Sequence, residues 1–183
     1  MNKIFKRTII LCIFTLCLSK VFASGLDKKN AIGVYVIAAA DTIGGIQYEH
    51  RFSDLISEKF GIYALYNTET YTTNPLDITF TAQTDFTLYA ADWNSVISSR
   101  LYAYGLAGYN GRITREYKYD EATYDSTIVS EELQNNAIAS AGFGFDFIFF
   151  DHLSVPVQFG FMANFPYSPH IGFCGGTALR YCW

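Results

Sequence analysis

The sequence predicts an all-β fold, an eight-stranded antiparallel up-and-down barrel that crosses a membrane. Eight segments alternate between apolar and polar residues. After the amino terminus, no apolar run approaches the about 20 residues that a transmembrane helix needs. The last segment alternates to its final residue, with Ile171, Phe173, Leu179, Tyr181 and Trp183 on one face. A strand that closes a barrel in lipid accounts for this apolar ending, because pairing with the first strand removes the exposed edge.

The amino terminus has the parts of a secretory signal peptide. A basic region precedes an apolar stretch of about eleven residues, Thr8–Leu18, and a Val-Phe-Ala sequence suited to cleavage follows. We therefore expect residues 1–23 to be removed and residues 24–183 to form one domain. Of the 13 Lys and Arg residues, four lie in the removed part, so 9 remain against 17 Asp and Glu. This acidic balance argues against a nucleic-acid partner.

The predicted strands are the eight alternating segments, which are rich in Thr, Tyr and Phe and are separated by turn-forming residues. They are expected over residues 31–38, 43–52, 60–68, 77–91, 99–115, 134–150, 153–164 and 170–183.

Three of these segments, 77–91, 134–150 and 153–164, have one face that is apolar and almost free of charge. Their opposite faces carry glycine and polar residues. In a membrane barrel the apolar face points to lipid, whereas in a soluble barrel it points to the interior. The long uncharged faces, with Tyr and Trp near the segment ends, favour the lipid-facing orientation. The first, third and fifth segments have aromatic and small residues on both faces, so their orientation is left open.

The polar faces predict a charged interior. Side chains just fill the inside of an eight-stranded barrel, and charges buried there must be paired or solvated. We therefore expect a plug of Arg–carboxylate pairs that stabilises the barrel, with a proton or ion path as the alternative and no large open pore. The predicted members are Glu49, Arg51, Asp85, Arg100, Arg112, Asp146 and Arg180.

The chain resembles the small eight-stranded outer-membrane barrels of the OmpA transmembrane domain, OmpX and OmpW type. The resemblance rests on the signal peptide, on Gly142–Phe147, on the tight Asp151-His152 turn into Leu153–Phe161, and on Leu179–Trp183. It covers the mature chain. It implies location in the outer membrane after secretion to the periplasm, contact with lipid and lipopolysaccharide, and no cofactor. In that family a similar ending is the insertion signal read by the barrel-assembly machinery, a role that the resemblance gives to Leu179, Tyr181 and Trp183.

The longest predicted connection, Glu116–Leu133, is acidic and is expected on the outside of the cell. Outer-membrane barrels have short periplasmic turns and longer extracellular loops. This surface loop is expected to be a solvated loop, and the alternative is that it binds a host or surface protein, or a divalent cation that bridges it to lipopolysaccharide. Its acidic residues are Glu116, Asp120, Glu121, Asp125, Glu131 and Glu132.

Catalytic and metal sites are not predicted. Lipid A deacylases of the same barrel class use a His-x-Ser pair, and His152-Leu153-Ser154 has this spacing but lies at a predicted periplasmic turn. His170 is better placed, at an extracellular rim. No histidine or cysteine cluster has metal-ligand spacing. Cys174 and Cys182 are eight residues apart on one strand, about 26 Å at roughly 3.3 Å per residue, which is too far for a disulfide.

The expected function is therefore a structural or surface-interaction role, in envelope integrity or adhesion. An outer-membrane lipid-modifying hydrolase that uses His170 or His152 is one alternative. A soluble periplasmic barrel that binds an apolar ligand is the other.

Overall fold

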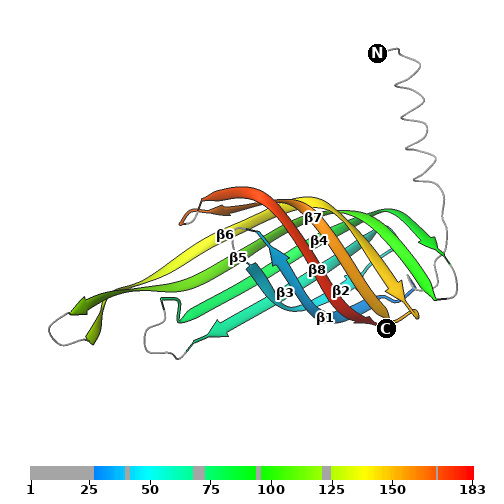
Figure 1. Ribbon diagram of the computed structural model, residues 1–183. Coiled ribbons are helices and arrows are strands. Elements are labelled where there is room, and N and C mark those ends of the chain that lie inside the picture. Colours follow the sequence, from blue (N-terminus) through cyan, green and yellow to red (C-terminus); the bar gives the residue numbers. More distant parts are fainter. Residues whose placement is uncertain (1–26, 40–41, 68–72, 94–95, 121–124, 168) are drawn as a thin grey trace, which may run out of the picture.

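The protein is a closed barrel of eight antiparallel strands (Figure 1), seen in a computed structural model that describes residues 27–39, 42–67, 73–93, 96–120, 125–167 and 169–183. Each strand pairs with the next, and β1 pairs with β8. This confirms the predicted fold class. The predicted signal peptide, residues 1–23, lies outside the described residues. In the described part, no helix is long and apolar enough to cross a membrane. The strands are β1 Asn30–Ala38, β2 Thr42–Arg51, β3 Ile56–Tyr66, β4 Leu76–Asp92, β5 Ile97–Asp120, β6 Asp125–Phe149, β7 Leu153–Phe165 and β8 His170–Cys182.

The predicted orientation of β4, β6 and β7 is confirmed. Phe80, Phe143 and Phe161 point outward and are 47%, 59% and 65% exposed, whereas the residues beside them in sequence face inward. The outer surface is therefore an apolar band, and the interior receives the polar face of each strand. Such a surface is suited to acyl chains, because soluble proteins rarely expose large contiguous apolar areas.

The strands whose orientation the sequence left open follow the same rule. In β1, Val34 is 59% exposed and Tyr35 is buried. In β3, Phe60 faces outward, and in β5 the rings of Tyr102 and Tyr104 face inward. Large residues on both parities of these strands arise because the interior contains tyrosine and aliphatic side chains as well as charges.

β3 begins four residues earlier than expected, so residues 56–59, which the predicted ranges leave in a turn between the second and third segments, belong to the strand. The turn comprises only Phe52–Leu55, where the hydroxyl of Ser53 accepts hydrogen bonds from the backbone N–H groups of Leu55 and Ile56. Adjacent charges at Glu58 and Lys59 resemble a solvated turn in the sequence. In the fold they are on opposite faces of a strand.

The predicted long loop Glu116–Leu133 is also wrong over most of its length. β5 and β6 have 24 and 25 residues and stay paired up to Asp120 and Asp125. A strand needs about 9–11 residues to cross a bilayer. Beyond Ile113 of β5 and Ala137 of β6, no pairing with β4 or β7 is seen among the described residues. The two strands therefore continue as a two-stranded ribbon, residues 114–120 and 125–136, which projects from the barrel (Figure 1).

The interior has two main layers. Nearest the end that holds Trp183 is a charged layer, which we define as Glu49, Arg51, Lys59, Asp85, Arg100, Asp146 and Arg180. Above it lies an apolar layer that the sequence analysis did not predict. Its members include Tyr35, Ile37, Ile43, Tyr102, Tyr104, Leu106, Ile138, Met162 and Cys174.

The apolar layer accounts for glycines in the facing strands. A Cβ atom at Gly144 would overlap the ring of Tyr102, and one at Gly160 would lie 2.6 Å from the hydroxyl of Tyr104. These glycines therefore make room for the tyrosine rings inside the barrel. Cys174 and Cys182 are both buried and are not joined in a disulfide.

Candidate functional site

Asp146 of β6 lies at the centre of the charged layer. Its Oδ2 atom is 3.0 Å from Nη2 of Arg180 and 3.4 Å from Nη2 of Arg100. Nη2 of Arg51 is 3.5 Å away. The hydroxyl of Ser154 donates a hydrogen bond of 2.6 Å to Oδ1. One carboxylate from β6 thus connects side chains from β2, β5, β7 and β8 across the lumen.

Glu49 of β2 is the second carboxylate of the layer and contacts the same three arginines. Oε2 is 2.5 Å from Nη1 of Arg180, and Oε1 is 2.9 Å from Nη2 of Arg100 and 3.1 Å from Nε of Arg51. Because Asp146 and Glu49 share their arginines, the five charges from four strands form one network.

Asp85 of β4 joins this network to a lysine. Oδ2 is 2.6 Å from Nζ of Lys59 and 3.4 Å from Nη2 of Arg100, and Oδ1 accepts a 2.7 Å hydrogen bond from Gln83. The ammonium group of Lys59 also lies 4.4 Å from the ring centre of Tyr102, a cation–π contact between the charged and apolar layers. Lys59 is not among the predicted residues, because it was placed in a turn. Lys59 lies two residues from Ser57 and from Gly61, and this shared parity is the sequence signal that indicates its inward position.

Arg112, the seventh predicted residue of the network, is not in the charged layer. It pairs with Asp77, with Nη2 to Oδ2 at 2.8 Å. Both side chains are partly exposed at the ribbon end of the lumen. Arg112 and Arg100 share the inward face of β5, but twelve residues at about 3.3 Å each separate them by about 40 Å.

The charged layer is fully buried, since each member is at most 6% exposed. A buried charge is costly unless it is paired and hydrogen-bonded, and removal of one partner typically costs about 3–5 kcal/mol. The stability of the folded barrel therefore depends on every member of the charged layer being present. It also fills the lumen with side chains, which is inconsistent with a wide aqueous pore.

Leu179 and Tyr181 of β8 and the following Trp183 face outward where β8 pairs with β1. Leu179, Tyr181 and Trp183 are about half exposed, and the rings of Tyr181 and Trp183 stack with centroids 6.4 Å apart. The backbone N–H and C=O of Trp183 exchange hydrogen bonds with Asn30 of β1, at 2.9 and 3.1 Å. The first and last strands of the barrel are thus joined by backbone hydrogen bonds at this end.

The ribbon is held mainly by its own strand pairing and by exposed polar contacts. Nε of Arg115 lies 2.6 Å from Oε2 of Glu131, and the hydroxyl of Ser130 donates a 3.2 Å hydrogen bond to Glu116. Glu132 is exposed. Of the other predicted acidic residues, Glu121 and the side chains of Asp120 and Asp125 lie outside the described part of the structure.

His152 and Ser154, which have the His-x-Ser spacing, are engaged by different groups. His152 stacks on Tyr181, and its Nδ1 lies 2.9 Å from the carbonyl oxygen of Cys182. Ser154 instead points into the lumen, where Asp146 and Arg180 engage its hydroxyl. His170 lies at the start of β8, and its predicted neighbour Ser168 is outside the described residues. The described residues contain no group of three or more His, Cys, Asp or Glu that could hold a metal ion.

No protein-family model and no curated protein sequence matches the chain. Among solved structures, the N-terminal β-barrel domain of Pseudomonas aeruginosa OprF is similar, with a TM-score of 0.58 at 8% identity over 85% of this chain and 98% of that one. Ail of Yersinia pestis, the attachment invasion locus protein, aligns over 85% and 95% with a TM-score of 0.45 at 9% identity. Its complex with the heparin analogue sucrose octasulfate gives 0.35 at 10% identity, over 85% and 96%. The likeness to OprF shows a shared eight-stranded barrel fold.

Proposed function

We propose that the chain is an integral barrel of the outer membrane of a diderm bacterium, with a structural or surface-interaction role. The observation that carries this proposal is the arrangement of side chains in a closed ring: an apolar band outside and a paired charged layer inside. In water this arrangement would expose the phenylalanines and bury the charges. In a membrane, the phenylalanines contact acyl chains and the charges are paired with one another inside the barrel, so both groups of side chains have favourable surroundings.

The shape of the barrel supports an orientation in the membrane. The short turns Phe52–Leu55 and Phe150–His152 lie at the same end as Trp183, whereas the ribbon projects from the opposite end (Figure 1). Short turns are typical of the periplasmic side and long hairpins of the extracellular side. The outer surface then contacts lipid and lipopolysaccharide. Leu179, Tyr181 and Trp183 provide the signal for the barrel-assembly machinery at the periplasmic end.

The ribbon is the part we propose to contact a host protein or another surface protein. It projects beyond the barrel, it has two edges without a strand partner among the described residues, and acidic side chains outnumber basic ones along it. Unpaired strand edges offer backbone hydrogen-bonding groups to a partner, and charge adds selectivity among partners. Because Ser154 is engaged by Asp146 and Arg180, we propose no catalytic role for the His152–Ser154 pair.

Fractionation tests the proposal directly. The protein should remain in the membrane pellet until detergent is added, and unheated samples should migrate faster on gels than boiled ones. Protease added to intact cells should cleave within residues 116–133 and leave the Phe52–Leu55 turn intact. Recovery of the protein in the soluble periplasmic fraction would exclude a membrane barrel, and cleavage only after the outer membrane is opened would reverse the orientation.

A further inference from the structure

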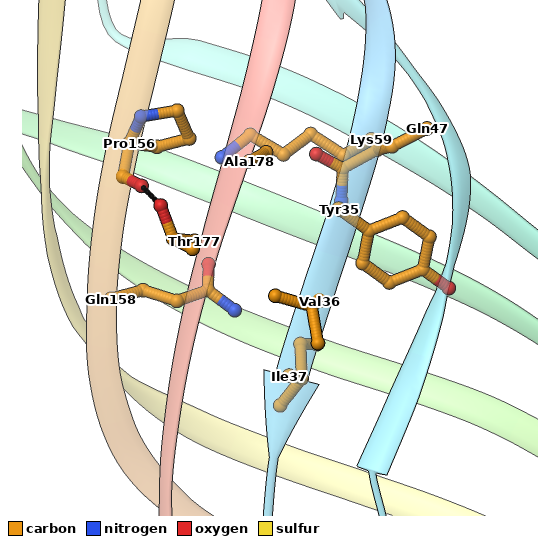
Figure 2. A pocket seen from close by; sticks show the side chains of 9 residues that line it. All are labelled: Tyr35, Val36, Ile37, Gln47, Lys59, Pro156, Gln158, Thr177 and Ala178. Atoms are coloured by element: carbon orange, nitrogen blue, oxygen red, sulfur yellow. Dashed lines mark hydrogen bonds between the residues drawn. The ribbon is translucent and has the colours of Figure 1, made fainter.

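A small cavity lies inside the barrel wall next to the charged layer and is lined by residues of β1, β2, β3, β7 and β8 (Figure 2). Its volume of about 10 Å³ leaves room for one particle of roughly the size of a water molecule. Figure 2 shows the side chains of Lys59, Gln47 and Gln158 around it. The first of these belongs to the charged layer, and the other two are buried amides.

The polar side chains around the cavity present hydrogen-bond donors to it. The amide oxygen of Gln47 accepts a hydrogen bond from Arg180, and that of Gln158 accepts from Gln83 at 3.2 Å and from Tyr102 at 3.5 Å. The side-chain oxygens are thus engaged elsewhere, which leaves the amide NH₂ groups for the cavity. Lys59 gives one of its three N–H donors to Asp85 and has others to offer.

The charged layer next to the cavity carries an uncompensated positive charge. Among the described residues it contains four cations, Arg51, Lys59, Arg100 and Arg180, but three carboxylates. Nη1 of Arg51 and Nε of Arg100 are buried and have no hydrogen-bond partner within the described part of the chain. A buried net charge is expensive in a medium of low dielectric constant. Among the described residues, the layer is therefore short of one negative charge.

We propose that this cavity is a binding site for a single monatomic anion, of the halide class, held by Lys59, Gln47 and Gln158. A halide accepts hydrogen bonds from all three groups and supplies the missing negative charge. A cation would be repelled by Lys59. A water molecule would satisfy the donors but would leave the charge unbalanced.

The barrel wall beside the cavity is less regular than the rest of the β7–β8 pairing. Pro156 has no N–H, and among the described strand pairs the β7–β8 ladder has no partners between Ser154–Arg180 and Val157–Thr177. The carbonyl oxygen of Pro156 is instead bonded by the hydroxyl of Thr177, at 2.8 Å (Figure 2). The wall beside the cavity is therefore closed by a side-chain hydrogen bond where the backbone ladder is interrupted.

Bromide is the probe for this site. Crystals of the refolded protein grown with bromide should give an anomalous peak in the cavity next to Nζ of Lys59. In detergent, exchange of gluconate for bromide at constant ionic strength should raise the melting temperature by a few degrees, because a ligand that binds only the folded state stabilises it. If ordered water alone fills the cavity, neither the peak nor the shift will appear, and the proposal is overturned.

Two variants of Gln158 make the test specific. Gln158→Leu should remove both the peak and the bromide dependence, whereas Asn136→Leu, a buried amide at the ribbon end of the lumen, should keep the bromide dependence. Gln158→Glu places a carboxylate beside the cavity at nearly unchanged volume. It should raise the melting temperature in gluconate and abolish the response to bromide. A lower melting temperature for Gln158→Glu in gluconate would show that the layer is already neutral and would refute the site, even if Gln158→Leu fails to fold.

Discussion

Asp146 in the charged layer and Glu131 on the ribbon both accept hydrogen bonds from arginine, at 3.0 and 2.6 Å, yet their surroundings differ completely. The side chain of Asp146 is fully buried, whereas that of Glu131 is 47% exposed and Arg115 is 27% exposed. The shorter distance alone would make the ribbon pair the stronger interaction. Its exposure makes it the weaker one, because water and salt screen its charges and can replace either partner. In this molecule, burial rather than distance determines what an ion pair contributes.

Asp77 with Arg112 provides an intermediate case in the same barrel. Their side chains are 17% and 25% exposed, and the hydrogen-bond lengths resemble those of the other two pairs. Three carboxylates, each facing an arginine, therefore form a series of rising exposure: Asp146, Asp77, Glu131. Replacement of each carboxylate by its amide removes the charge and leaves size almost unchanged, so the series isolates the effect of burial.

The largest effect is expected for Asp146→Asn. The amide can still accept the hydrogen bond from Ser154, but Arg51, Arg100 and Arg180 are left with one fewer buried countercharge. The free energy of unfolding should fall by about 3–5 kcal/mol, as measured by urea titration of the refolded barrel in detergent micelles. A loss below about 1 kcal/mol, the range of surface pairs, would mean that water reaches the layer and that burial is not decisive.

A pair of glycine variants tests whether the apolar layer is as tightly packed as the charged one. Gly144→Ala places a methyl group against the buried ring of Tyr102, so the free energy of unfolding should fall by about 1–3 kcal/mol. Gly105→Ala is the matched control on the outer face of the neighbouring strand, where a Cβ meets nothing within 4 Å. It should be neutral or stabilising by up to about 1 kcal/mol. A Gly144→Ala variant as neutral as Gly105→Ala would show that the ring of Tyr102 moves aside and that the apolar layer is not tightly packed.

These comparisons also explain which features the sequence could predict. Alternation has a period of two, so it reveals the face of a strand wherever one face is uniformly apolar, as in β4, β6 and β7. Alternation does not reveal at which level along the barrel axis a residue lies. Arg112 and Arg100 have the same parity, and only the register, in which Asp77 faces Arg112 and Asp146 faces Arg100, separates them.

Two wrong predictions of secondary structure arose where charged residues are clustered in the sequence. Lys59 and the ribbon were taken for turn and loop, because runs of charged residues usually mark solvated segments. In both places the charges fall on alternate faces of a strand and are neutralised across it: Lys59 by Asp85 inside the lumen, and Arg115 by Glu131 on the ribbon. Cross-strand partners become visible only when the register is known.

Asp77→Asn should have an intermediate effect. The carboxylate accepts two hydrogen bonds from Arg112 and one from Asn110 at the ribbon end of the lumen. The amide keeps one acceptor but loses the charge, so a loss of about 1 kcal/mol in the free energy of unfolding is expected. Part of it should disappear in 1 M salt, where the Debye length is about 3 Å. A loss as large as that of Asp146→Asn, independent of salt, would place this pair in a dry interior.

The smallest effect is expected for Glu131→Gln. The side chain of Arg115 remains accessible to water, and its backbone N–H still donates a 2.7 Å hydrogen bond to the carbonyl of Thr73. The free energy of unfolding should therefore change by less than about 0.5 kcal/mol, since exposed pairs contribute little. If the ribbon is a surface for contact with another protein, its charges serve association rather than folding, because rim charges mainly set the rate and salt dependence of encounter. The same variant would then alter binding of a surface partner while leaving the urea midpoint unchanged. A shift of that midpoint comparable to that of Asp77→Asn would instead make the ribbon part of the folded core.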